Sequence, residues 1–235
     1  MSTRSGRGCV IVFEGGEGSG KSTQLRRVAA VFERYGVAHV CLREPGGTPL
    51  GTEVRRVLLD RASDIEPRAE ALLFMASRAQ LVEREIRPAI ARGDVVLLDR
   101  FFLSTYAYQI GGHDLAERDV RNANGFATGG LVPDLTLLLA FPFAEGLVRA
   151  ARRDLAHDRM EAMGEGFHAR VAQALASFSQ PEWQAGHPEC GPIVAVDAAG
   201  SEDEVFMRVA NALNARYPEM MPAEAFTDLG DVDAR

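Results

Sequence analysis

A short apolar run followed directly by a glycine-rich turn constrains the fold of this chain more than any other feature. The run CVIVF (Cys9–Phe13) is continuous, rich in β-branched residues and stopped by glycine, as is typical of a buried strand in a parallel sheet. Four further apolar runs alternate with helical stretches, and this alternation predicts a parallel sheet with helices on both faces. The predicted strands are Cys9–Phe13, Val37–Leu42, Asp94–Asp99, Asp134–Phe141 and Pro192–Asp197.

The stretches between these strands read as helices. A length of 235 residues suits one such α/β domain, and no repeat or interdomain linker is visible. We therefore expect a single domain over residues 1–216, followed by an acidic, frayed tail over 217–235. Pro88 is expected to kink the longest helix. The predicted helices are Lys21–Tyr35, Thr52–Asp60, Glu66–Arg92, Ser104–Ile110, Leu115–Ala127, Phe143–Arg153, Glu165–Ser179 and Glu202–Tyr217.

Composition argues against several classes of protein. The formal net charge of -7 comes without a basic tail or stripe, which argues against nucleic-acid binding. The three cysteines and five histidines show no metal-ligand spacing, so we expect no zinc site and a reducing compartment. The first apolar run is too short for a secretion signal or a membrane span. These features predict a cytoplasmic protein with no membrane partner.

The turn after the first strand matches a phosphate-binding pattern. Gly15, Gly20, Lys21 and Ser22 fit G-x-x-x-x-G-K-[ST] between a strand and a helix. In such a loop, backbone N–H groups surround the phosphates of a nucleotide, the lysine reaches the β- and γ-phosphates, and the hydroxyl binds Mg²⁺. The residues predicted to hold the ATP phosphates are Gly15, Gly16, Glu17, Gly18, Ser19, Gly20, Lys21, Ser22 and Thr23.

A census of basic residues supports this interpretation. Of the 26 Lys and Arg residues, Lys21 is the single lysine. An ammonium is a compact point charge, whereas guanidinium is a wide planar fork, so a tight loop around a triphosphate has room only for lysine. A guanine-binding switch protein would need a second lysine in an N-K-x-D element. A small kinase is therefore favoured.

Three further segments predict a site for a phosphorylated acceptor. REPGGTPLG places Arg43 just past the second strand, LLFMASRAQ places Phe74 and Arg78 four residues apart on one helix face, and LLDRFFLSTYAYQ places Asp99 and Arg100 at a strand end. Ligands of such sheets bind at the carboxyl ends of the strands. An aromatic face suits a base and bidentate arginine suits a phosphate.

Together these segments resemble the thymidylate kinase family, over roughly Cys9 to Arg216. The motifs are FEGGEGSGKST, REPGGT, LLFMASRAQ, DRFFLSTYAYQ, PDLTLLL and DRME. The resemblance implies a P-loop NTPase-type three-layer α/β fold with a five-stranded parallel sheet and a short lid at about residues 149–162. It also implies Mg²⁺-dependent transfer of the γ-phosphate of ATP to dTMP by a homodimer.

The resemblance further implies roles for residues of the acceptor site. Phe74 stacks on the thymine, Arg78 donates to a base carbonyl, and Tyr108 packs under the deoxyribose. The other residues implied to line the site near base or sugar are Pro45, Leu58, Ser104, Thr105 and Gln109. Around the phosphates, Arg43 and Arg100 hold the monophosphate, Glu17 binds the sugar 3′-hydroxyl, and Asp99 organises Mg²⁺ with Ser22.

The lid segment RAARRDLAHDRME carries several arginines. The phosphate loop has no arginine between Gly15 and Lys21, which resembles the bacterial type of the family with a catalytic arginine in the lid. We favour Arg153 and Arg149 for this role, with Arg152 left open. The sequence departs from the family pattern at Ala140, where aspartate is frequent, and at Phe101, where tyrosine is common.

Two alternatives stay open at this point. The first is another nucleotide or nucleoside kinase; a nucleoside kinase needs a carboxylate base after the first strand, where Glu14 stands. The second is a non-catalytic nucleotide-binding regulator, which only Ala140 supports.

Overall fold

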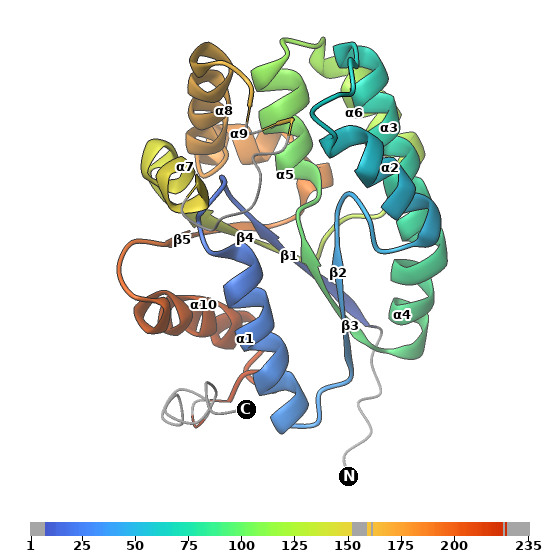
Figure 1. Cartoon of the computed structure of the whole chain (residues 1–235). Coiled ribbons are helices and arrows are strands. Elements are labelled where there is room, and N and C mark those ends of the chain that lie inside the picture. Colours follow the sequence, from blue (N-terminus) through green and yellow to red (C-terminus); the bar gives the residue numbers. More distant parts are fainter. Residues whose placement is uncertain (1–7, 152–158, 161, 223, 225–235) are drawn as a thin grey trace.

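A computed structural model describes residues 8–151, 159–160, 162–222 and 224. Its five strands form one parallel sheet in the order β2-β3-β1-β4-β5 (Figure 1). Each strand begins and ends within a few residues of its predicted position, and the predicted fold class is confirmed. The strands are β1 Cys9–Glu14, β2 His39–Arg43, β3 Val95–Asp99, β4 Leu135–Ala140 and β5 Ile193–Asp197.

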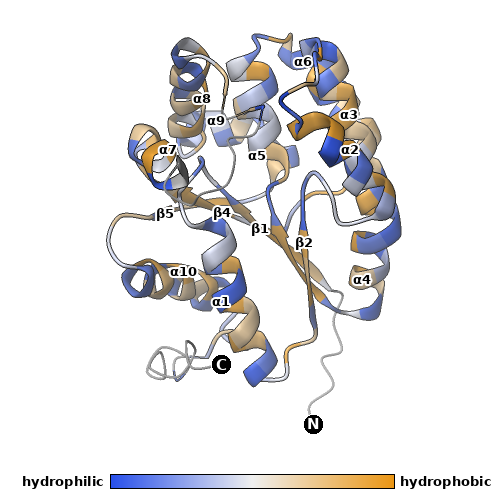
Figure 2. Ribbon diagram, viewed as in Figure 1, coloured by the Kyte–Doolittle hydropathy of each residue, from blue (hydrophilic) through white to orange (hydrophobic). Residues whose placement is uncertain are grey.

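Two hydrophobic clusters cover the two faces of the sheet and give three layers. Alternate side chains of β1 point to opposite faces: Val10 and Val12 join one cluster, whereas Ile11 and Phe13 join the other. Helices α1 (Lys21–Arg34) and α10 (Glu202–Arg216) cover the second face, as Figure 1 shows. The strands are the most continuously hydrophobic part of the ribbon in Figure 2.

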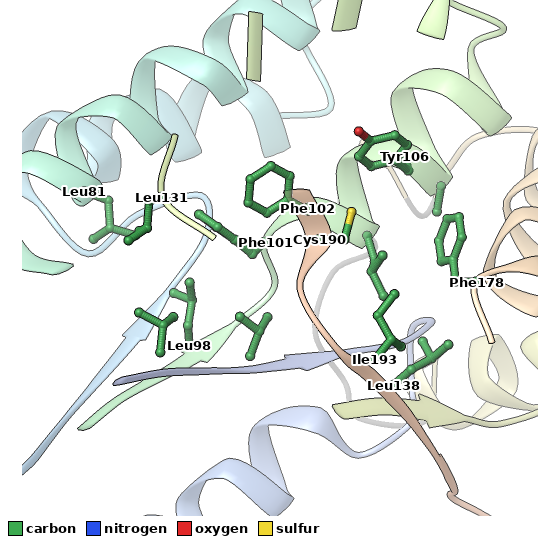
Figure 3. Close-up of a cluster of buried hydrophobic side chains, with 14 of the residues drawn as sticks. Leu81, Leu98, Phe101, Phe102, Tyr106, Leu131, Leu138, Phe178, Cys190 and Ile193 are labelled. Atoms are coloured by element: carbon green, nitrogen blue, oxygen red, sulfur yellow. The ribbon is translucent and has the colours of Figure 1, made fainter. Parts of the chain in front are cut away.

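The first face is covered by the remaining helices. Figure 3 shows Leu81, Phe102 and Tyr106 packed with strand residues Leu98 and Leu138. These helices are α2 Pro49–Leu59, α3 Pro67–Leu81, α4 Arg87–Arg92, α5 Phe102–Thr105, α6 Glu117–Thr128, α7 Phe143–Ala151, α8 Glu165–Ser177 and α9 Pro181–Gly186. Helix α9 and the 3₁₀ turn η3 (Pro188–Cys190) were not predicted.

Two predicted helices contain π-helical turns. The stretch Glu66–Arg92 is divided by η1 (Val82–Ile86), and the helix after β3 continues as η2 (Tyr106–Gly112). Pro88 has no N–H to donate within a helix. In the π turn just before it, the backbone N–H of Arg87 donates to the carbonyl of Val82, five residues earlier. The helix continues through the proline as α4.

The predicted boundary of the tail is wrong. Met220 and Met221 are buried in the same cluster as α1 and α10, and Asn214 Nδ2 donates to the carbonyl of Met221 at 2.6 Å. Two methionines can bury enough apolar surface to hold this segment on the core. The packed domain therefore extends past residue 216. Among the described residues, no helix has the length and apolar character needed to cross a membrane.

Candidate functional site

A cavity of about 420 Å³ opens at the carboxyl edge of the sheet, where such folds bind ligands. It is bounded by the phosphate loop, the ends of β2 and β3, and helices α2, α3 and α5. Most residues predicted for the nucleotide and acceptor sites line it: Glu17, Gly18, Gly20, Lys21, Ser22, Thr23, Arg43, Pro45, Phe74, Arg78, Asp99, Arg100, Ser104, Thr105, Tyr108 and Gln109.

Two side chains of the phosphate loop donate hydrogen bonds to the backbone of the same loop. Ser19 Oγ and Lys21 Nζ both donate to the carbonyl of Gly16, at 2.8 and 2.7 Å. Gly20 adopts a left-handed φ of 89° just before α1, which glycine tolerates without strain. Burial, reinforced by nearby Arg100, lowers the pKa of Lys21 to about 8 despite neighbouring carboxylates.

Ser22 and Asp99 form the pair predicted to bind Mg²⁺. Ser22 Oγ donates to Asp99 Oδ2 at 2.5 Å, and both side chains line the cavity next to the loop. Among the described residues, no group of three or more His, Cys, Asp or Glu side chains could hold a metal. Mg²⁺ commonly binds through one or two protein oxygens plus substrate phosphates, so this donor set fits that ion.

Arg100 links the phosphate loop to the rest of the cavity. Its backbone has a left-handed φ of 71°, a conformation that costs about 1–3 kcal/mol for a residue with a side chain. Its guanidinium pairs with Glu17 and donates to Ser104 Oγ at 2.9 Å. The hydroxyl of Tyr108 lies 3.4 Å from Glu17 Oε1. Although burial alone would raise the pKa of Glu17, Arg100 and Lys21 lower it to about 2.

Glu14 has a structural role that was not predicted. Its carboxylate is fully buried and accepts from the backbone N–H groups of Phe101 and Ser104, at 2.7 and 3.0 Å, and from Ser104 Oγ at 2.7 Å. These bonds fix the turn that carries Arg100. Glu14 does not line the cavity, so its carboxylate is not placed as a base for a nucleoside hydroxyl.

All five N–H groups of Arg78 already have protein acceptors. They donate to Glu44, to Thr105 Oγ1 at 3.0 Å, to Asn124 Oδ1 at 2.6 Å and to the carbonyl of Phe101 at 2.8 Å. Arg78 must therefore exchange one of these partners to reach a base carbonyl, and its contact with the base stays a prediction. The acceptors Glu44 and Asn124 were not singled out from the sequence.

The lining of the cavity also includes an aromatic ring, an amide group and a thioether group. They belong to half-buried Phe74, buried Gln109 and Met160. The predicted pocket contact of Leu58 is wrong: Leu58 is fully buried in the core, and it is Leu59 that lines the cavity. On a helix, consecutive residues face different sides.

Two further lining residues, Arg55 and Met160, also had no signal in the sequence. Arg55 lines the cavity and donates to the carbonyl of Pro45 at 3.1 Å. Met160 belongs to the DRME motif, but nothing in that motif indicates a pocket contact. The Glu44–Pro45 peptide is cis.

Helix α7, which includes the start of the predicted lid, packs against the phosphate loop. A methyl group added to Gly146 would overlap the carbonyl oxygen of Glu17, and one added to Gly18 would overlap the backbone of Gly146. Arg149 stacks on the ring of Phe141, 3.8 Å from its centroid, and does not line the cavity. Arg152 and Arg153 lie outside the described residues.

Comparison with known proteins agrees with this geometry. The model of the family "Thymidylate kinase" matches residues 13–185. A thymidylate kinase of Deinococcus radiodurans is 45% identical over 210 residues, which cover 89% of this chain and 98% of the relative. Those of Leifsonia xyli and Nitratidesulfovibrio vulgaris are 42% and 44% identical, over 92% and 87% of this chain and 100% and 95% of theirs. The chain belongs to the thymidylate kinase family.

Proposed function

We propose that this protein is a dTMP kinase that transfers the γ-phosphoryl group of ATP to the phosphate of dTMP. The observation that carries this proposal is the joining of two sites in one cavity. Residues of the phosphate loop line the same cavity as the arginines Arg43, Arg55 and Arg100 and as Phe74 and Gln109. Arginine suits an acceptor that already carries a phosphate, and an aromatic ring with a carboxamide suits a flat base.

The reaction needs little acid–base chemistry from the protein. An oxygen of the dTMP phosphate forms a bond to the γ-phosphorus in line with the breaking bond to ADP. The acceptor's second pKa is about 6, so it is largely a dianion at neutral pH and needs no general base. Lys21 and Arg100 neutralise charge on the phosphates. Mg²⁺, held by Ser22 and Asp99, would supply further charge neutralisation when bound.

The pairing of Arg100 with Glu17 supports a role for both at the acceptor. Glu17 is kept ionised at neutral pH, so its carboxylate can accept a bond from the sugar 3′-hydroxyl. Arg100 can turn part of its guanidinium to the monophosphate. The burial of Tyr108 beside this pair supports the proposal that Tyr108 packs under the deoxyribose, and Phe74 is proposed to stack on thymine.

The lid arginines complete the proposal. Arg149 and Arg153 are our candidates for the arginine that stabilises the transferring group. Arg149 would have to leave the ring of Phe141, where cation–π stacking holds it.

Substrate assays and one variant test the proposed function. We expect ATP-dependent ADP release with dTMP, and far less with dCMP, dGMP or thymidine. Activity on thymidine in place of dTMP would contradict the proposal, and absence of dTDP at ordinary enzyme concentrations would favour a non-catalytic regulator. The variant Lys21→Ala should lower kcat by about 10²-fold or more while leaving the dissociation constant of dTMP within about threefold, measured by calorimetry.

We further propose that the protein is a homodimer in the cytoplasm. Neighbouring helices α2, α3 and α6 (Figure 1) carry four exposed large hydrophobic residues, among them Leu72 at 62% and Phe126 at 91% exposure. A contiguous exposed apolar patch marks an interaction site, and contacting helices can bring such side chains into one patch. The cytoplasmic location is supported by the pattern of the cysteines, which indicates a reducing compartment.

A further inference from the structure

Arg159 of the DRME motif and the start of α3 meet at a buried carboxylate that the proposed mechanism does not use. Glu70 lies in the first turn of α3, four residues before Phe74, and its side chain is fully buried. Gln109 Nε2 donates to Glu70 Oε1 at 2.8 Å, and Arg159 Nη2 donates to Glu70 Oε2. His113 Nε2 lies 3.1 Å from Glu70 Oε1.

Arg159 fixes the orientation of this carboxylate. Its Nε donates to the carbonyl of Leu58 at 2.9 Å and its backbone N–H to the carbonyl of Leu59 at 3.1 Å. These two bonds to α2 fix the position of the guanidinium. A guanidinium has only N–H donors, so Arg159 can donate to Glu70 but cannot accept from it. Burial alone would raise the pKa of Glu70, but the nearby His113 ring and the bonds from Arg159 and Gln109 lower it, so the group stays ionised and can only accept.

This arrangement determines which end of the Gln109 carboxamide faces the cavity. One N–H of Gln109 is committed to Glu70, because a carboxylate cannot pair with the carbonyl oxygen. The carbonyl oxygen is then the acceptor that Gln109, a lining residue of the cavity, can offer to a ligand. A pyrimidine that carries an N–H in its ring, as thymine does, complements an acceptor, whereas cytosine presents an acceptor of its own at that ring nitrogen.

We propose that Glu70 is a specificity-determining positioning residue: by fixing the Gln109 carboxamide, it selects pyrimidine nucleotides with a ring N–H. The proposal rests on the proposed function, which assigns the base to the lining residues Phe74 and Gln109. It concerns Glu70 alone, which touches no substrate and acts through Gln109.

The variant Glu70→Gln tests this directly. Its carboxamide must keep the oxygen toward the donor-only Arg159, so its NH₂ faces Gln109. The Gln109 carboxamide then has to invert and offer NH₂ to the ligand. The ratio of kcat/KM for dTMP to that for dCMP should fall at least about tenfold, because the contact that distinguished the two is reversed. The matched control Glu66→Gln, exposed at the N-terminus of the same helix, should keep the wild-type ratio.

A double-mutant cycle separates this role from a general effect on the fold. In a Gln109→Leu background the carboxamide is gone, so adding Glu70→Gln should change the dTMP-to-dCMP ratio less than about twofold. A further drop as large as in the wild-type background would overturn the proposal, as would an unchanged ratio in the single variant.

If Glu70→Gln does not fold, hydrogen exchange in the wild-type protein still tests the proposal. The side-chain NH₂ signals of Gln109, assigned by their loss in Gln109→Leu, should include one proton that exchanges slowly with solvent; free exchange of both would overturn the proposal. A wild-type protein that does not phosphorylate dTMP contradicts the proposed function, whereas an active one with an unchanged ratio in Glu70→Gln contradicts only the role of Glu70.

Discussion

At the scale of single residues, Lys21 titrates in an unusual range. Its pKa is lowered from 10.5 to about 8 by burial and by Arg100, so in the ligand-free protein roughly three quarters of it is neutral at about pH 8.5. A bound triphosphate favours the charged ammonium and raises this pKa again.

ATP binding should therefore take up a proton at alkaline pH. At about pH 8.5, well above the second phosphate pKa of about 6, calorimetry in buffers of different ionisation enthalpy should show uptake of roughly 0.5–0.8 proton per ATP. At about pH 6.5 Lys21 is already protonated and contributes none. The variant Lys21→Met should lose the uptake at the higher pH, and an unchanged uptake in that variant would assign the proton to another group.

At the scale of elements, the contact between α7 and the phosphate loop makes Gly146 a second testable position. The variant Gly146→Ala pushes its methyl into the carbonyl of Glu17, which should cost about 1–3 kcal/mol of stability. Because the loop or the helix must shift, kcat should fall about tenfold or more, since such displacements are costly in phosphoryl transfer.

The matched control is Gly166→Ala in α8, whose added methyl would meet only the guanidinium of Arg170, at 3.7 Å. Thermal unfolding and steady-state kinetics of the two variants check this. Equal kcat values would show that the contact between helix and loop is not needed for catalysis.

The elements themselves were largely predictable, and the reasons are local. A continuous apolar run such as CVIVF can only be buried, and a glycine loop before Lys21 fixes where α1 begins. The π turns η1 and η2 could not be predicted, because a single extra residue per turn leaves the hydrophobic pattern almost unchanged.

The hydrogen-bond partners of the buried polar residues of the site were harder to predict from the sequence. Glu70 is satisfied by Arg159, 89 positions away, and Arg78 by Asn124, 46 positions away. Such partners meet only in the folded chain, so local spacing cannot reveal them. The phosphate loop, in contrast, carries its ligand-binding groups in consecutive residues, and its outline was therefore clear from the sequence.

At the scale of the whole molecule, the exposed side chains on α2, α3 and α6 predict an interface. Phe126→Glu places a charge at the most exposed of the large hydrophobic residues described, where burial in an interface would cost several kcal/mol. Light scattering after size exclusion should show a dimer for the wild type and a monomer for this variant. Tyr35→Glu, at the C-terminal end of α1, removes a similar exposed ring elsewhere and should stay dimeric. A wild-type monomer would contradict the interface.

The single lysine has a consequence for chemical labelling. Lys21 carries the one side-chain amine in the chain, and its pKa of about 8 leaves it largely nucleophilic under the mildly alkaline conditions of acylation. An amine-selective reagent small enough to enter the cavity thus has one side-chain target, besides the terminal amine. Without any substitution, the protein offers a single side-chain attachment point at the atom predicted to contact the donor phosphates, and protection of that atom by ATP would report nucleotide occupancy.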